Sequence, residues 1–149
     1  MSRKRCHRQI WAALPPRGLR TRMSGSQLTT ISIAHLQNLD DVMRGTATVQ
    51  VLWDLAECVF TWTRVAELLG RGVAEMAPQL AVAAAVIERF GRTGRIGFSG
   101  PEYTVAKDGV QVMDELAAIV DVDTAKAAAE WSDRKLAALV SAERQKTLA

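Results

Sequence analysis

Apolar residues recur every three or four positions along most of the chain after residue 26, which is the spacing of one face of an α-helix. Leu36, Leu39 and Met43 are one example. Alanine is frequent and aromatic residues make up only 5% of the chain, which favours helices over sheets. We therefore predict an all-α fold, a four- or five-helix bundle-like domain with short links. The expected helices cover residues 27–44, 46–69, 75–92, 101–120 and 124–146.

Cap residues and prolines set the expected helix boundaries. Ser26, Thr46 and Asp123 each precede a predicted helix, and their side chains can accept hydrogen bonds from the first backbone amides of that helix. Pro101 suits the first position of the fourth helix, and Pro78 is tolerated if it lies in the first turn of the third. Glycine-bearing stretches separate the first four predicted helices.

The segment 46–69 is apolar on several faces, as is usual for a central helix. We expect the two longest helices, 46–69 and 124–146, to form the centre of the bundle. Trp62 points partly away from Phe60, because a full turn takes 3.6 residues. It packs either against a neighbouring helix or at an oligomer contact, and we favour the core. Gly109 lies inside a predicted helix, where it indicates a hinge or a tight contact.

The charges divide the chain into a basic arm, residues 1–26, and a helical domain, residues 27–149. Residues 1–24 contain seven basic residues and no acidic one, whereas the remainder holds 12 basic and 16 acidic residues. The overall net charge of +3 therefore hides a body with a net charge of −4. The arm residues expected to bind a partner or nucleic acid are Arg3, Lys4, Arg5, Arg8, Trp11, Arg17, Arg20 and Arg22.

Four interpretations of the arm remain open. Arginine and lysine neutralise phosphates, and Trp11 can stack on a base or fill an apolar pocket, so the arm can bind a macromolecule. Alternatively, the arm folds back onto the acidic body or remains a solvated tail. An arginine-rich start without acids is also typical of a mitochondrial presequence, but Pro15 and Pro16 interrupt the amphipathic helix that a presequence needs.

The stretch GRTGRIGFSGPE places Arg92 and Arg95 among glycines, directly before the helix that starts at Pro101. Backbone amides at a helix N-terminus attract anions, so these arginines are candidate ligands for a phosphate or a partner's carboxylates. The spacing fits neither a Walker loop nor a dinucleotide-binding fingerprint. A plain interhelical turn is the alternative that we favour.

The sequence offers little material for catalysis. His35 and Cys58 are the only candidate base and nucleophile within the domain, and they can act together only if two helices bring them into contact. A cysteine on an apolar helix is usually an inert part of the core. The adjacent Cys6 and His7 cannot supply the four ligands of a metal site. We therefore expect no catalytic residue, no metal ligand and no cofactor, and hence no enzyme.

Cysteine content and hydropathy bear on location. Two cysteines, one of them in the arm, do not make a disulfide framework, which favours the reducing cytoplasm. The sequence has no uncharged apolar run of about 18 residues, so we expect no membrane span.

The start, MSRKRCHR, and the stretch RFGRTGRIGFSGPEYTVAKDGVQVMDELAAIVDVDTAKAAAE together carry a resemblance. The chain resembles small, poorly characterised proteins of temperate phages and prophages of proteobacteria that begin with an RKRxYRP-type sequence. His7 and Gln9 stand where tyrosine and proline are usual in that pattern. The resemblance implies a phage origin and action in the cytoplasm of a bacterial host. It carries over no catalytic residues.

The leading hypothesis is a phage-type, non-enzymatic accessory protein that binds a host protein or nucleoprotein complex. Inhibition of a host defence system such as a CRISPR complex is one form of this activity. A nucleic-acid-binding protein or transcriptional regulator, contacting DNA or RNA through the arm, is the second hypothesis. A virion assembly or structural protein is the third, and a homo-oligomer is compatible with each of them.

Overall fold

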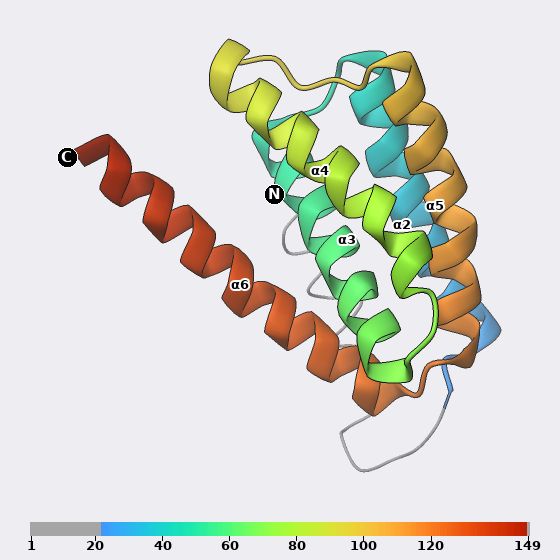
Figure 1. Cartoon of the computed structure of the whole chain (residues 1–149). Coiled ribbons are helices and arrows are strands. Elements are labelled where there is room, and N and C mark those ends of the chain that lie inside the picture. The colour runs from blue at the N-terminus through green and yellow to red at the C-terminus, as the bar shows by residue number, and fades with distance from the viewer. Residues whose placement is uncertain (1–21, 149) are drawn as a thin grey trace.

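A computed structural model describes residues 22–148, which form helices and no strand (Figure 1). An isolated antiparallel bridge joins Arg22 to Asp121. The prediction of an all-α, bundle-like fold is therefore confirmed. In chain order the helices are α2 (Gly25–Arg44), α3 (Val49–Leu69), α4 (Val73–Thr93), α5 (Gly100–Ile119) and α6 (Val122–Leu148).

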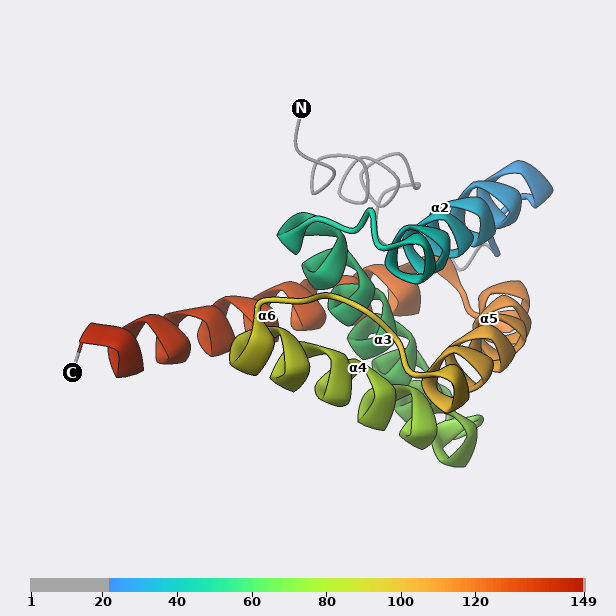
Figure 2. The same cartoon turned by 90° about the horizontal axis from the view of Figure 1, so that it is seen from above.

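Helix α3 lies at the centre and packs against each of the other four helices. Helices α2 and α5 lie side by side, and α4 packs against both α3 and α5 (Figures 1 and 2). Helix α6 packs on α3 with its first half, and its second half then projects away from the bundle (Figure 1). The expected central position of segment 46–69 is confirmed. The expectation that the last helix shares the centre is wrong, because only its beginning is covered.

Two predicted N-caps are each displaced by two residues. Helix α2 is capped by Ser24 instead of Ser26: the Ser24 hydroxyl accepts from the Gln27 amide, and the Gln27 side chain accepts from the Ser24 amide. This reciprocal pair satisfies two donors, an arrangement that Ser26 does not make. Helix α3 is capped by Thr48 instead of Thr46, because the Thr48 side chain accepts from the backbone N–H of Val51.

The later boundaries also differ from the predictions. Asp121, and not Asp123, caps α6: its carboxylate accepts a hydrogen bond of 2.6 Å from the Thr124 amide. Pro78 is the sixth residue of α4, so it lies in the second turn instead of the first. The proline has no N–H to donate there, which removes one bond of the helical ladder.

The last residues of the predicted arm, 22–26, lie within the described part of the chain. The backbone of Arg22 bridges to Asp121, and Met23 is only 7% exposed within the main core cluster. Helix α2 then begins at Gly25. Residues 22–26 therefore belong structurally to the helical body and not to an arm.

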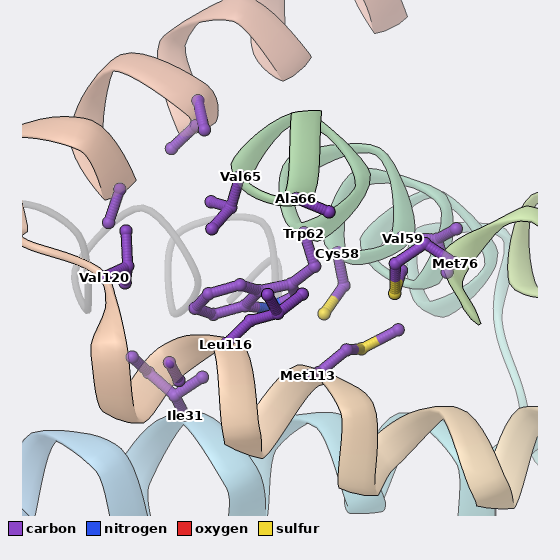
Figure 3. Packing of buried hydrophobic residues seen from close by; sticks show 14 of the residues in the cluster. Ile31, Cys58, Val59, Trp62, Val65, Ala66, Met76, Met113, Leu116 and Val120 are labelled. Carbon is purple, nitrogen blue, oxygen red and sulfur yellow. The ribbon is translucent and has the colours of Figure 1, made fainter. Parts of the chain in front are cut away.

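Trp62 occupies the middle of the main core cluster, at 1% exposure, between Val65, Leu116 and Ile31 (Figure 3). The prediction that Trp62 belongs to the core is confirmed. Small side chains let α6 approach α3 closely: Ala125, Ala128 and Ser132 of α6 are fully buried. A second cluster joins α2, α3 and α5 through Leu39, Val42, Val51, Leu55, Ala106 and Val110.

Gly109 marks a tight contact between α4 and α5. The side-chain amide of Gln79 lies against its backbone, and a Cβ added at Gly109 would overlap that amide. Gln79 is buried and donates from Nε2 to the Val105 carbonyl at 2.8 Å. The glycine thus allows a buried amide to reach the backbone of the facing helix, and the predicted tight contact is confirmed.

Candidate binding surfaces

Of the arm residues that the sequence predicts to bind a partner or nucleic acid, the structure describes one. Arg22 is described, and it is exposed. Its backbone is held by Asp121, whereas its side chain faces solvent. The others lie outside the described residues, so their assignment as binding residues stays a prediction: Arg3, Lys4, Arg5, Arg8, Trp11, Arg17 and Arg20.

Arg92 and Arg95 are exposed at the end of α4 and in the loop that follows. Gly94 has a left-handed conformation, with φ of 73°, and ends α4 between them. Their assignment as ligands for a phosphate or a partner's carboxylates stays a prediction. A different arginine, Arg89, makes the ordered contacts of this loop.

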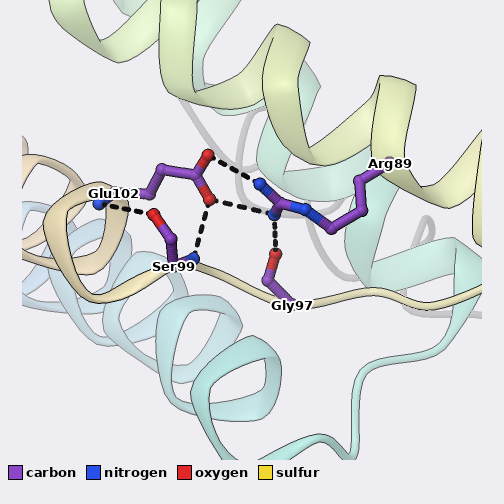
Figure 4. A network of polar contacts seen from close by, with 4 residues as sticks. All are labelled: Arg89, Gly97, Ser99 and Glu102. Atoms are coloured by element: carbon purple, nitrogen blue, oxygen red, sulfur yellow. Dashed lines mark hydrogen bonds and ion pairs between the residues drawn. The ribbon is translucent and has the colours of Figure 1, made fainter.

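Arg89 and Glu102 form a two-bond ion pair that ties α4 to α5 (Figure 4). Both terminal guanidinium nitrogens, Nη1 and Nη2, donate to the carboxylate at 2.9 Å, and Nη1 also donates to the Gly97 carbonyl at 2.7 Å. Ser99 completes the network by capping α5, since its hydroxyl accepts from the Glu102 amide and its own amide donates to Glu102 at 2.7 Å.

In this network, side chains of the protein itself occupy the positive N-terminal end of α5. The hydrogen bond from Arg89 lowers the pKa of the Glu102 carboxyl below its ordinary value, and the same bond raises the pKa of Arg89. The capping amides of α5 are taken by Ser99 and Glu102, so the anion that the sequence led us to consider is supplied by the chain itself. The geometry is that of a rigid interhelical turn.

His35 of α2 and Cys58 of α3 meet inside the core. The Cys58 sulfur lies 2.8 Å from His35 Nδ1, and both residues are buried at 5% exposure or less. Burial raises the pKa of the Cys58 thiol, and the nearby Glu57 charge raises it further. The thiol therefore stays protonated, opposite to an activated nucleophile. The adjoining cavity, between His35 and Gln79, has a volume of about 10 Å³, room for roughly one water.

A group of cations and aromatic rings lies on the surface where α6 crosses α3. We call Phe60, Arg64, Trp131 and Lys135 the cation–aromatic cluster. The Arg64 guanidinium is 5.2 Å and the Lys135 ammonium 4.7 Å from the centre of the Trp131 ring. Lys135 also lies 5.7 Å from the Phe60 ring.

Sequence reasoning missed this cluster, although a local signal existed. Phe60 and Arg64, and likewise Trp131 and Lys135, are four residues apart, a spacing that brings an aromatic ring and a cation together on one helix face. What the spacing could not reveal is that the two pairs meet across the α3–α6 contact.

The part of the chain that the structure describes holds no group of three or more His, Cys, Asp or Glu side chains arranged for a metal ion. Across residues 22–148, no helix has the length and apolarity required to cross a bilayer. The chain matches no protein-family model, no curated protein and no solved structure.

Proposed function

We propose that this protein is a non-enzymatic accessory protein of phage type that binds a negatively charged host macromolecule, foremost a nucleoprotein complex, in the bacterial cytoplasm. The observation that carries the proposal is the cation–aromatic cluster on the outside of the α3–α6 contact. The arm adds six basic residues before residue 22 and no acidic one. Inhibition of a defence complex such as a CRISPR complex is the specific form that the resemblance suggests.

The chemistry of the cluster suits such a partner. Lys135 is exposed, Arg64 is one-third exposed in its side chain, and Trp131 is half-buried beneath both cations. Cations neutralise phosphates or carboxylates, and an aromatic face accepts a base or an apolar side chain. Arg92 and Arg95 are also exposed, at the C-terminal end of α4 and in the loop that follows it.

Affinity purification of the tagged full chain from bacterial extract, followed by mass spectrometry, tests the proposal. We expect the Arg64→Ala/Lys135→Ala variant to recover several-fold less of a defined host complex than the wild type. The matched control is Arg71→Ala/Lys107→Ala, which removes one exposed arginine and one exposed lysine elsewhere. Equal recovery by all three proteins, with unchanged helical circular dichroism, would contradict the proposal.

The aromatic component of the cluster favours one second candidate, direct binding of DNA or RNA. Gel retardation across a salt series tests it, because each phosphate contact adds about −0.9 to the slope of log affinity against log salt. Removing Arg64 and Lys135 should reduce that slope by about 2 units. Absence of retardation of any DNA or RNA probe in low-salt buffer rejects direct binding and leaves a protein partner.

A further inference from the structure

Helices α2 and α5 leave an open groove between them on the surface of the bundle. Four residues of α2 and two of α5 line this α2–α5 groove: Leu28, Thr29, Ser32, Ile33, Asp114 and Ala117. Its volume is about 340 Å³, which is room for roughly ten waters, whereas the cavity beside His35 has room for roughly one. The groove is therefore large enough to receive side chains from another segment.

Apolar side chains continue from the groove along the exposed face of α2. Ile33, which lines the groove, and Leu36 are 49% and 46% exposed, and Met43 is 55% exposed. Spacings of three and seven residues place all three on one side of the helix. A single exposed leucine is ordinary on a protein surface, whereas an apolar row beside a groove is typical of a site that binds an amphipathic helix.

The surface around the groove is rich in negative charge. Helices α2 and α5 together contain six acidic and two basic residues. Asp114 lies in the groove itself, where its exposed carboxylate accepts a hydrogen bond of 3.3 Å from the Ser32 hydroxyl. An apolar groove with acidic surroundings fits a helix that combines apolar side chains with positive charge.

The projecting half of α6 has this complementary composition. Residues 134–148 contain four basic residues and one acidic residue. None of the side chains that the structure describes in this stretch is buried, and Leu139 and Leu148 are 44% and 89% exposed. A helix of this length is marginal in water by itself, so a contact that covers its apolar residues would stabilise it.

The two surfaces lie at opposite ends of one molecule. Helix α6 leaves the bundle on the side away from the pair of α2 and α5, and α3 lies between them in both views (Figures 1 and 2). The projecting half of α6 therefore cannot reach the α2–α5 groove of its own chain. Only the groove of another molecule is accessible to it.

We propose that the projecting half of α6 docks in the α2–α5 groove of a second copy of this chain. Leu139 packs on Ile33 and Leu36, and the cations of residues 134–148 face the carboxylates of α2 and α5. The contact joins two different surfaces, so it either closes into a ring, of which a reciprocal dimer is the smallest, or continues as a chain of copies. This self-association goes beyond the proposed function, because it concerns the free protein.

Sedimentation equilibrium of the full chain between about 10 µM and about 1 mM tests the docking without any other partner present. We expect the average mass to rise above that of the monomer as the protein concentration rises. The rise should be smaller at high salt, because salt screens the attraction between exposed opposite charges. A monomer throughout this concentration range would overturn the proposal.

Matched variants identify the two surfaces. Ile33→Glu/Leu36→Glu places charges beside the groove, and Leu139→Glu places one on α6, so each variant should weaken self-association several-fold. The control Leu68→Glu/Val73→Glu replaces two other apolar side chains, each 47% exposed, and should associate as the wild type does. Equal weakening by the control would indicate general apolar association and overturn the proposal.

An equimolar mixture of the groove variant and the α6 variant decides whether the two surfaces bind each other. One variant keeps an intact α6 and the other an intact groove, so the mixture should form dimers under conditions in which each variant alone is monomeric. Failure of the mixture to associate would overturn the proposal, because each surface would then pair with its own kind. If the groove variant loses helical circular dichroism, Asp114→Lys, which reverses a charge in the groove, takes its place. The proposed function is tested separately, because none of these substitutions lies in the cation–aromatic cluster.

Discussion

Helix α3 and the second half of α6 are both regular helices, but they are held in different ways. In α3, 13 of 21 residues are buried, and they cover all sides of the helix except the one that carries Phe60 and Arg64. Among the side chains of α6 that the structure describes, the buried ones all precede residue 133, and Leu139 is 44% exposed. Four helices surround α3, whereas the end of α6 projects into solvent (Figure 1).

The difference shows which forces maintain each helix. Burial of apolar surface stabilises α3 by about 25 cal/mol per Å², and this term depends on its neighbours. The end of α6 depends on the helix propensity of its alanine, leucine, lysine and arginine residues. Isolated helices of this length are marginal, so the end of α6 should open locally long before the bundle unfolds.

The largest change in the free energy of unfolding is expected from a substitution that disrupts the packing around α3. Trp62→Ala should lower the free energy of unfolding by about 3–5 kcal/mol, because it leaves a large cavity among fully buried side chains. Leu139→Ala, in the projecting part of α6, should change it by less than about 0.5 kcal/mol. Urea titration followed by circular dichroism measures both. Equal effects of the two substitutions would contradict the contrast between the helices.

A substitution of intermediate effect tests whether the contact between α4 and α5 is as closely packed as the surroundings of α3. Gly109→Ala should destabilise by about 1–3 kcal/mol, because the added Cβ overlaps Gln79, although alanine favours a helix by about 1 kcal/mol. Gly91→Ala, which meets nothing within 4 Å, should be neutral or stabilising. In a double-mutant cycle, Gln79→Ala should reduce the cost of Gly109→Ala. An additive cycle would exclude this overlap as the cause.

The smallest effect is expected from loss of the ion pair between Arg89 of α4 and Glu102 of α5. Glu102→Gln should destabilise by about 1 kcal/mol at neutral pH, through loss of the ion pair with Arg89. Because the pKa of the folded carboxyl lies below its ordinary value of about 4.3, its contribution is present above that value and is lost as the pH falls through the lowered pKa.

Unfolding in urea at pH 7 and near pH 3 measures this dependence. The difference between the wild type and Glu102→Gln should shrink at the lower pH. The control is Glu67→Gln, in an ion pair with Arg64 whose Glu67 side chain is 43% exposed, and its effect should stay below about 0.5 kcal/mol. A pH-independent difference for Glu102→Gln would contradict the role of its charge.

The predicted helices all exist, but their starts were misplaced because cap residues occur in pairs. Ser24 and Ser26, and likewise Asp121 and Asp123, are two residues apart, and each is a suitable cap by type. The spacing Ser24-x-x-Gln27 is itself the sequence signature of a capping box and could have decided the first case. In the second case the bridge from Arg22 to Asp121 is a contact between segments about 100 residues apart.

The candidate surfaces likewise include features that are visible in the sequence and contacts that only the structure reveals. The basic arm was visible as composition, and the cation–aromatic spacings within α3 and within α6 were visible as local patterns. The contact of His35 with Cys58 and the pairing of Arg89 with Glu102 join different helices. No local pattern chooses between such partners, since many polar side chains occur at equivalent helical positions.

The sequence by itself determined that the chain is all-α, that its second predicted helix is central and that Trp62 lies in the core. The spacing of apolar residues carries this information, because burial of an apolar helix face is favourable whichever element covers it. Only the tertiary structure decided which helices meet, where Asp54 and Glu57 are placed, and that α6 leaves the bundle after its first half. Those outcomes depend on side-chain shape and close packing across helices, which no single helix encodes.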